Sequence, residues 1–157
     1  MIRVGHGFDV HPFSDEAGRP LLLAGVSFPG ERGLAGHSDA DVVAHAVADA
    51  LLGAAGLGDL GELFPDTDPQ WHGADSLRLL AEVVNRIDAE GWTVANVDCS
   101  VILEAPKLKP HRRAMELKLG AVLSAPASVK AKRAEGLGAL GRREGIACMA
   151  VALLERG

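Results

Sequence analysis

The sequence predicts an α/β (α+β) fold, in which helices pack on one face of a mixed β-sheet. Segments with the periodicity of strands alternate with segments of helical periodicity, and few hairpin turns join neighbouring strands. No repeat, low-complexity tract or linker rich in Pro and Ser divides the 157 residues. Residues 1–157 are therefore expected to form a single domain.

The first half of the chain contains two predicted strands and one predicted helix. Residues 2–11 alternate Ile, Val, His, Phe and Val on one face with Arg, Gly, Gly, Asp and His on the other. Residues 20–28, PLLLAGVSF, are a second candidate strand. A helix is predicted to begin at Ser38, with Asp41 completing an approximate capping box, and to end at Gly56.

The second half adds two helices and three strands. A helix is predicted over 75–91, where Leu, Leu, Val and Ile recur at helical spacing, and another over 110–123, which a proline opens. Residues 94–103 alternate between an apolar and a polar face, and residues 128–131 form a short strand. Residues 145–154 are almost wholly apolar, which is typical of a central strand covered on both faces.

The charge of the chain argues against one class of partner. The net charge is −5, and no cluster of Lys and Arg stands beside aromatic residues. Nucleic acid is therefore not an expected partner. A small anionic ligand remains compatible with this charge if its site supplies positive groups of its own.

Two further features predict a cytoplasmic protein. Cys99 and Cys148 do not make a disulfide framework, which fits a reducing compartment. Residues 1–13 have no apolar signal region, and the longest apolar run, 146–154, is too short to cross a bilayer. Neither export nor membrane insertion is expected.

Three residues have the spacing of a metal site. Asp9 and His11 are separated by one residue, so on a strand both project from the same face, ~7 Å apart along the chain. His45 lies on the first predicted helix, in an i, i+4, i+8 stripe with Asp41 and Asp49 that could orient its imidazole. One Asp and two His would leave a fourth zinc position open. A hydrogen-bonded surface pair and a solvated helix face remain the alternative.

Two loops are candidates for phosphate or cation binding. His37 and Ser38 precede the first helix, where free N–H groups can bind phosphate, although Ser38 is equally interpreted as a simple N-cap. In the loop over 58–69, Asp66 and Asp68 fit turn positions, while Asp59 and Glu62 fit cation ligands. The composition does not decide between these interpretations.

Five segments together resemble one known family. They are HGFDVH (6–11), HSDADVVAHAVADALLGAAGLGD (37–59), LFPDTDP (63–69), EAPKLKPH (104–111) and GRREGIAC (141–148). In this order they are similar to the signature segments of the 2-C-methyl-D-erythritol 2,4-cyclodiphosphate synthases, and the likeness covers essentially the whole chain. The resemblance favours the zinc interpretation over a surface pair.

The resemblance implies two metal sites and two residues with catalytic roles. Asp9, His11 and His45 match the zinc ligands of the family. Glu135 matches a carboxylate that binds Mg²⁺ or Mn²⁺ on the substrate diphosphate. His37 matches a residue assigned to stabilising the transition state, and Arg133 stands where the family has a threonine with the same assignment.

The resemblance also implies a set of substrate contacts. Residues 37–38 match contacts to phosphate, 59–61 and 64–68 match the loop that holds the erythritol phosphate end, and 103–109 match the cytidine pocket. The full set is Asp9, His11, His37, Ser38, Asp59, Leu60, Gly61, Phe64, Pro65, Asp66, Thr67, Asp68, Leu103, Glu104, Ala105, Pro106, Lys107, Leu108, Lys109, Lys132, Arg133, Ala134, Glu135, Ala139 and Arg142.

The activity implied is the cyclisation of a cytidine diphosphate-linked substrate with release of CMP, a step of isoprenoid precursor synthesis. Members of the family are homotrimers with active sites at the subunit interfaces, and the apolar segment 145–154 suits such packing.

One region departs from the family pattern. Lys132, Arg133 and Ala134 replace a threonine run, and Gly136 and Ala139 replace a common Lys and Phe. Arg133 can donate N–H groups to the same phosphate. A binding protein without turnover and an unrelated zinc hydrolase are the alternatives to a cyclase.

Overall fold

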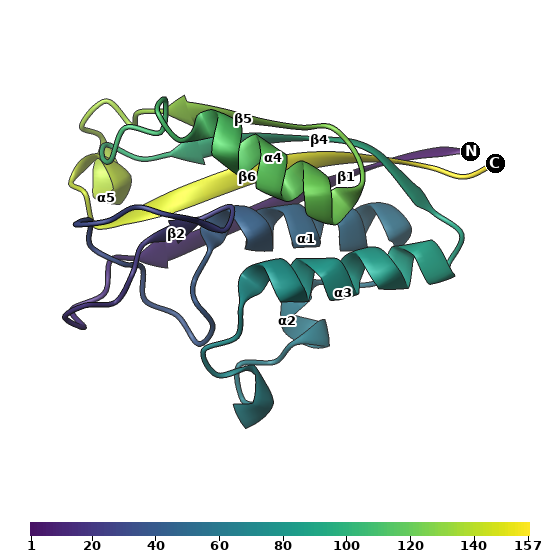
Figure 1. The fold of residues 1–157 in the computed structure, drawn as a ribbon, viewed down its shortest axis with the longest axis horizontal. Helices are drawn as coiled ribbons and strands as arrows, with labels where there is room; N and C mark the ends of the chain where they lie inside the picture. Colours follow the sequence, from purple (N-terminus) through teal and green to yellow (C-terminus); the bar gives the residue numbers. More distant parts are fainter.

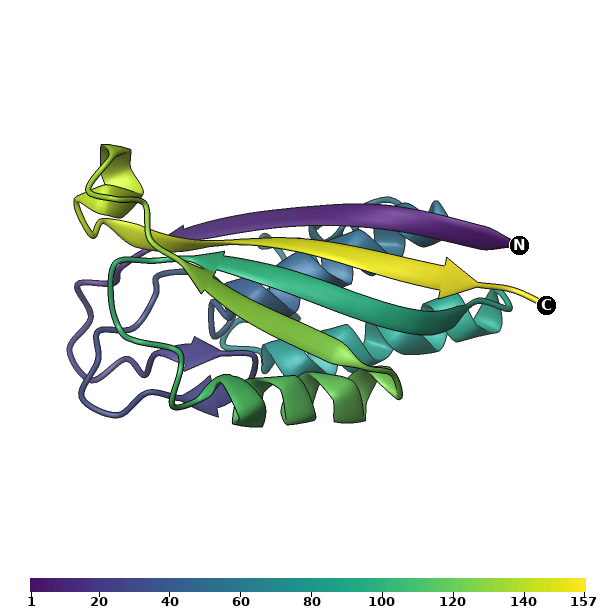
Figure 2. The ribbon, with the colours of Figure 1, turned by 90° about the horizontal axis from the view of Figure 1, so that it is seen from above.

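The computed structural model describes residues 1–157, and its centre is a four-stranded sheet in the order β1-β6-β4-β5. These strands are β1 (Ile2–Pro12), β6 (Gly145–Glu155), β4 (Thr93–Ile102) and β5 (Ala127–Lys132). β6 is antiparallel to both neighbours, whereas β4 and β5 are parallel, which confirms the mixed sheet (Figure 2). The first and last strands of the chain are therefore paired along their whole length.

Three helices cover one face of this sheet (Figure 1). They are α1 (Val42–Ala55), α3 (Ser76–Ala89) and α4 (Arg112–Leu123). α1 packs directly on β1 and β6, α3 packs on α1, and α4 packs on β5. The shorter elements are α2 (Leu60–Leu63), a 3-10 helix η1 (Pro69–Trp71) and α5 (Gly138–Gly141). None of the helices has the length and apolar content of a bilayer-crossing segment.

Two glycines of β1 allow α1 to lie unusually close to the sheet. A Cβ atom added at Gly5 would lie 1.9 Å from the carbonyl oxygen of Ala50, and one added at Gly7 would lie 1.9 Å from that of Ala46. Any other residue at these positions would collide with the helix backbone. The face of β1 that packs against α1 is therefore the face that also carries Asp9 and His11.

The other face of the sheet has no helix over it. Val4 and Phe8 on β1 are 66% and 49% exposed, and Met149 and Val151 on β6 are 46% and 45% exposed. The prediction that residues 145–154 are covered on both faces is therefore wrong for residues 149–154 of the single chain. Residues 145–148 are all buried, but from Met149 on only alternate residues, such as Ala150, are buried.

Residues 20–28 form a hairpin rather than one strand. β2 (Leu22–Leu23) and β3 (Val26–Ser27) make a separate two-stranded sheet. Ala24 and Gly25 between them have φ values of 52° and 71°, the left-handed pair that a tight two-residue hairpin turn requires. The apolar sequence concealed this turn, because alanine is not a usual left-handed residue.

The first helix begins three residues later than predicted. Asp41, not Ser38, is its N-cap, and the carboxylate accepts hydrogen bonds from the N–H groups of Val43 and Ala44. It also accepts from the hairpin turn, at 2.8 Å from Ala24 N and 2.6 Å from Gly25 N. These bonds occupy donors at the start of α1 that were expected to be free for phosphate.

The fully buried Asp41 carboxylate joins α1 to the hairpin, so its removal should destabilise the fold. We expect Asp41→Ala to lower the free energy of unfolding by about 3 kcal/mol, because it leaves buried N–H groups without acceptors. Asp75→Ala removes an exposed cap with one bond, to Leu77 N, and should cost only about 1 kcal/mol. Urea unfolding at one protein concentration compares the two, and equal losses would contradict the joining role.

Candidate metal centre and substrate cavity

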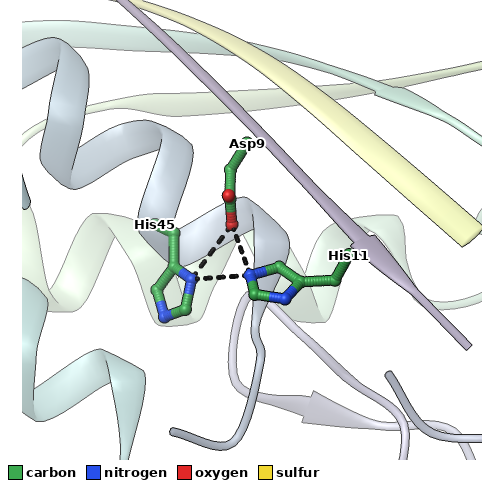
Figure 3. Close-up of side chains that lie close together, drawn as sticks. All are labelled: Asp9, His11 and His45. Carbon is green, nitrogen blue, oxygen red and sulfur yellow. Dashed lines mark hydrogen bonds and ion pairs between the residues drawn. The ribbon is translucent and has the colours of Figure 1, made fainter. Parts of the chain in front are cut away.

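Asp9, His11 and His45 converge as the sequence predicts (Figure 3). Asp9 Oδ2 lies 2.9 Å from His11 Nε2 and 3.0 Å from His45 Nδ1. The two imidazole nitrogens are 3.3 Å apart. Ligands at tetrahedral angles about 2.0–2.1 Å from a zinc ion lie about 3.3 Å from one another, so the triangle has the size of a metal centre.

When the two rings are neutral, the hydrogen bonds on their far sides leave both inner nitrogens as acceptors. His11 Nδ1 lies 2.8 Å from the carbonyl oxygen of Ala35 and must donate to it, so the lone pair of the neutral ring is on Nε2. His45 Nε2 lies 2.8 Å from Ser76 Oγ. The Ser76 hydroxyl itself donates to the Asp39 carboxylate, so its oxygen accepts from His45, whose Nδ1 is bare.

With both rings neutral, the carboxylate and the two inner imidazole nitrogens are three acceptors without a donor. Either a proton on an imidazole or a cation between the three groups balances this arrangement, and the donor set suits a divalent metal that accepts nitrogen and oxygen ligands. The three residues can therefore hold a metal ion.

The charges around Asp9 agree with this interpretation. Burial opposes ionisation of Asp9, but hydrogen bonds and charges from His11 and His45 outweigh it and hold its pKa far below the usual range. Burial likewise disfavours the charged form of His11, yet the contact with Asp9 raises its pKa. The Asp9 carboxylate is thus ionised at neutral pH and attracts positive charge to this position.

The groups that orient His45 are not the ones expected from the helix stripe. Asp41 caps α1 and binds the hairpin, and Asp49 accepts the N–H of Leu60 at 2.8 Å. The orienting pair is Ser76 with Asp39, and Asp39 also accepts the Ser76 N–H at 3.0 Å. Ser76 lies at the start of α3, so no local pattern around His45 could have identified it.

The metal group lies in a cavity of about 600 Å³. Eleven of the predicted site residues line it: Asp9, His11, His37, Ser38, His45, Asp59, Leu60, Gly61, Phe64, Pro65 and Asp66. Asp49, which was expected only as an orienting partner of His45, also lines it, and the sequence analysis missed four others, Phe8, Gly36, Trp71 and Leu79. The missed residues carry no chemical signature of their own and become part of the site only through packing.

The loop over 58–69 is ordered by two of its carboxylates. Asp59 caps α2 by accepting the N–H of Glu62 at 2.9 Å, and Asp68 caps η1 by accepting that of Gln70 at 3.0 Å. The carbonyl oxygen of Asp68 lies 3.2 Å from His37 Nε2. Asp59 and Asp68 therefore act as helix N-caps in this loop, whereas Asp66 is exposed and lines the cavity.

Apart from Thr67 and Asp68 of the loop over 58–69, the remaining predicted residues lie in segments 103–109 and 132–142, a second group outside this cavity. The Leu103 N–H donates to the Lys132 carbonyl at 2.9 Å, which joins residues 103–109 to residues 132–135. The Arg133 guanidinium donates to Glu104 at 3.0 and 2.8 Å, and the Ala134 N–H donates to it at 2.8 Å. Ala139 and Arg142 follow on α5 and just after it. None of these residues lines the cavity with the metal group.

The sequence and the fold are those of a known family. The profile of the YgbB family matches residues 2–155, and the chain belongs to that family. Curated relatives carry a specific name: a Bordetella petrii protein called 2-C-methyl-D-erythritol 2,4-cyclodiphosphate synthase is 55% identical over 98% of this chain and 96% of its own length. A Salinibacter ruber protein of the same name is 54% identical over 98% of this chain and 99% of its own length.

Solved structures of related proteins have a similar fold. The bifunctional IspDF from Campylobacter jejuni superposes with a TM-score of 0.95 and 43% identity over 100% of this chain, which spans 43% of that longer protein. A CDP-bound 2C-methyl-D-erythritol-2,4-cyclodiphosphate synthase superposes with a TM-score of 0.87 and 40% identity over 98% of this chain and 100% of its own. The recognition made from the five segments is confirmed.

The convergence of three acceptors predicts stoichiometric metal binding. After dialysis against trace divalent metals we expect about one ion per chain. His45→Ala should reduce this content at least ~10-fold, because it removes the ligand supplied by the helix. His72→Ala, an exposed histidine beside His37, should retain the full content. Plasma mass spectrometry measures both, and full occupancy in His45→Ala would show that the ion binds elsewhere.

Proposed function

We propose that this chain converts 4-diphosphocytidyl-2-C-methyl-D-erythritol 2-phosphate to 2-C-methyl-D-erythritol 2,4-cyclodiphosphate with release of CMP. The reaction belongs to the non-mevalonate pathway to isoprenoid precursors. The observation that carries the proposal is the convergence of Asp9, His11 and His45 in a cavity most of whose other lining residues belong to the segments shared with the family. The high identity to relatives named for this activity supports it.

The ion at this centre is proposed to be zinc. Asp9, His11 and His45 supply three of its four ligands and leave one position for a substrate oxygen. Bound zinc supplies positive charge that polarises a phosphate and reduces repulsion between two anions. The Ser76–Asp39 pair holds the His45 ring in the tautomer that such a ligand needs.

The residues of the cavity are proposed to position the substrate rather than to react with it. Asp59–Gly61 and Phe64–Asp68 would hold the erythritol phosphate end, and His37 and Ser38 would contact the diphosphate. An oxygen of the 2-phosphate forms a bond to the β-phosphorus while the bond from that phosphorus to the CMP oxygen breaks. Because nucleophile and leaving group belong to one molecule, catalysis depends on alignment and charge neutralisation.

The second group of residues is proposed to bind the cytidine diphosphate end. Leu103–Lys109 would form the cytidine pocket, and Glu135 would hold a Mg²⁺ or Mn²⁺ ion on the diphosphate. Glu104 orients Arg133 by two hydrogen bonds. The third guanidinium nitrogen of Arg133 is the group that we propose contacts phosphate in place of the family's threonine. Lys132, Ala134, Ala139 and Arg142 would complete this half of the site.

A homotrimer would bring these two groups together. They do not line the same cavity within one chain, which supports the proposal that a neighbouring copy supplies one of them. The uncovered sheet face, with exposed Val4, Phe8, Met149 and Val151, provides an apolar surface for such packing. A closed ring of three copies repeats the same unlike contact three times.

Phosphorus NMR tests the activity directly. With the 2-phosphate substrate and magnesium, we expect the diphosphate resonances to be replaced by those of CMP and a cyclic diphosphate. The conversion should follow metal content, so His45→Ala should lose both together. Unchanged substrate with metal-loaded protein would instead identify a binding protein without turnover.

Mixed subunits test whether the site is shared. His45→Ala and Lys107→Ala should each be inactive alone, because each lacks one half of every site. Unfolding them together in equal amounts and refolding should restore about a quarter of wild-type activity, because about one interface in four then joins two intact halves.

The matched control mixes His45→Ala with His11→Ala. Both variants lack the metal half, so their mixture should stay inactive. Native mass spectrometry confirms that mixed trimers form. Mixed trimers of the first pair without restored activity would contradict a shared site, and so would monomers with wild-type activity.

A further inference from the structure

The guanidinium of Arg19 binds backbone carbonyls of the segment over 34–38, which carries His37 and Ser38. Its Nε donates to the Leu34 carbonyl at 2.5 Å, and its Nη2 donates to the carbonyls of Gly36 at 3.1 Å and Ser38 at 2.7 Å. The side chain is only 20% exposed, and it does not line the cavity. Apart from the charge that it places near His11, Arg19 therefore contacts the site only through the backbone of this segment.

The two remaining carbonyls of the segment also have partners. That of Ala35 accepts from His11 Nδ1, and that of His37 accepts from the Gly73 N–H at 2.8 Å. In contrast, the N–H groups of Gly36, His37 and Ser38 donate no hydrogen bond within the chain. All three of these residues line the cavity.

The geometry of the peptide bond connects these observations. In a trans peptide the N–H points opposite to the C=O. The bond from Arg19 to the Gly36 carbonyl therefore turns the His37 N–H away from the guanidinium. A cation at the carbonyl ends also favours the orientation in which the N–H ends present partial positive charge on the other side. Successive free N–H groups of this kind form a binding surface for an anion.

We propose that Arg19 is a positioning residue. It holds the Gly36–Ser38 backbone so that the free N–H groups and the His37 imidazole bind a phosphate of the substrate beside the metal. The inference rests on the proposed cyclisation for its effect on turnover, whereas its effect on phosphate affinity can be measured without turnover.

The test compares Arg19→Gln and Arg19→Lys with Arg32→Gln. Arg32 is a suitable control because it also binds a backbone carbonyl nearby, that of Ser14 at 2.6 Å, but none in segment 34–38. The measurements are kcat and KM for CMP release, metal content, and affinity for inorganic pyrophosphate by calorimetry on metal-loaded protein.

Arg19→Gln should lower kcat about 10- to 100-fold and pyrophosphate affinity about 10-fold, with metal content unchanged. Arg19→Lys should lose nearly as much, because an ammonium keeps the charge but cannot bridge three carbonyls. Arg32→Gln should match the wild type. Should Arg19→Gln fail to fold, Arg19→Lys carries the same comparison.

Wild-type kcat and pyrophosphate affinity in both Arg19 variants would overturn the proposal. Recovery of activity on adding zinc would also overturn it, because Arg19 would then act through Ala35 and His11. If the wild type releases no CMP, the proposed function fails, but the pyrophosphate titration still decides the role of Arg19. Equal affinity in wild type and variants, or no binding by the wild type, counts against it.

Discussion

The close contact between α1 and β1 is the constraint on which the centre depends. Gly5 and Gly7 have no side chain where the carbonyls of Ala50 and Ala46 approach, so the helix lies directly on the strand. This brings His45 Nδ1 to 3.0 Å from Asp9 Oδ2. A side chain at either glycine would push the helix outward and separate the ligand of the helix from those of the strand. The metal group is therefore a consequence of backbone packing as much as of the ligands themselves.

Around this contact, hydrogen bonds determine which ring nitrogen of each histidine ligand carries the proton. Ala35 fixes the proton of His11 on the outer nitrogen, and Asp39 does the same for His45 through Ser76. With both rings neutral, the centre is a set of three acceptors that a cation satisfies. The same principle extends to segment 34–38, where every carbonyl has a partner and the N–H groups of Gly36, His37 and Ser38 face no protein acceptor.

One face of the sheet is covered within the chain, and the other is not. The helices bury one face, while β1 and β6 leave apolar side chains exposed on the opposite face. In the same way, the cavity contains the metal group but not the segments over 103–109 and 132–135. In the proposed trimer, neighbouring copies would both cover the apolar face and supply the missing segments.

The sequence by itself predicted the mixed sheet and the helices from local periodicity, and it predicted the three metal ligands from residue types and spacing together with the resemblance of five segments to a family. It did not reveal the hairpin at Ala24, since an alanine in a left-handed turn gives no local signal. The helix start at Asp41 and the roles of Asp39, Ser76 and Arg19 were decided by tertiary structure alone. Each of these acts on a partner far away in the chain, such as His45 for Ser76 and Gly36 for Arg19. A hydrogen bond between distant segments exists only once the sheet and helices have packed, and no spacing along the sequence encodes it.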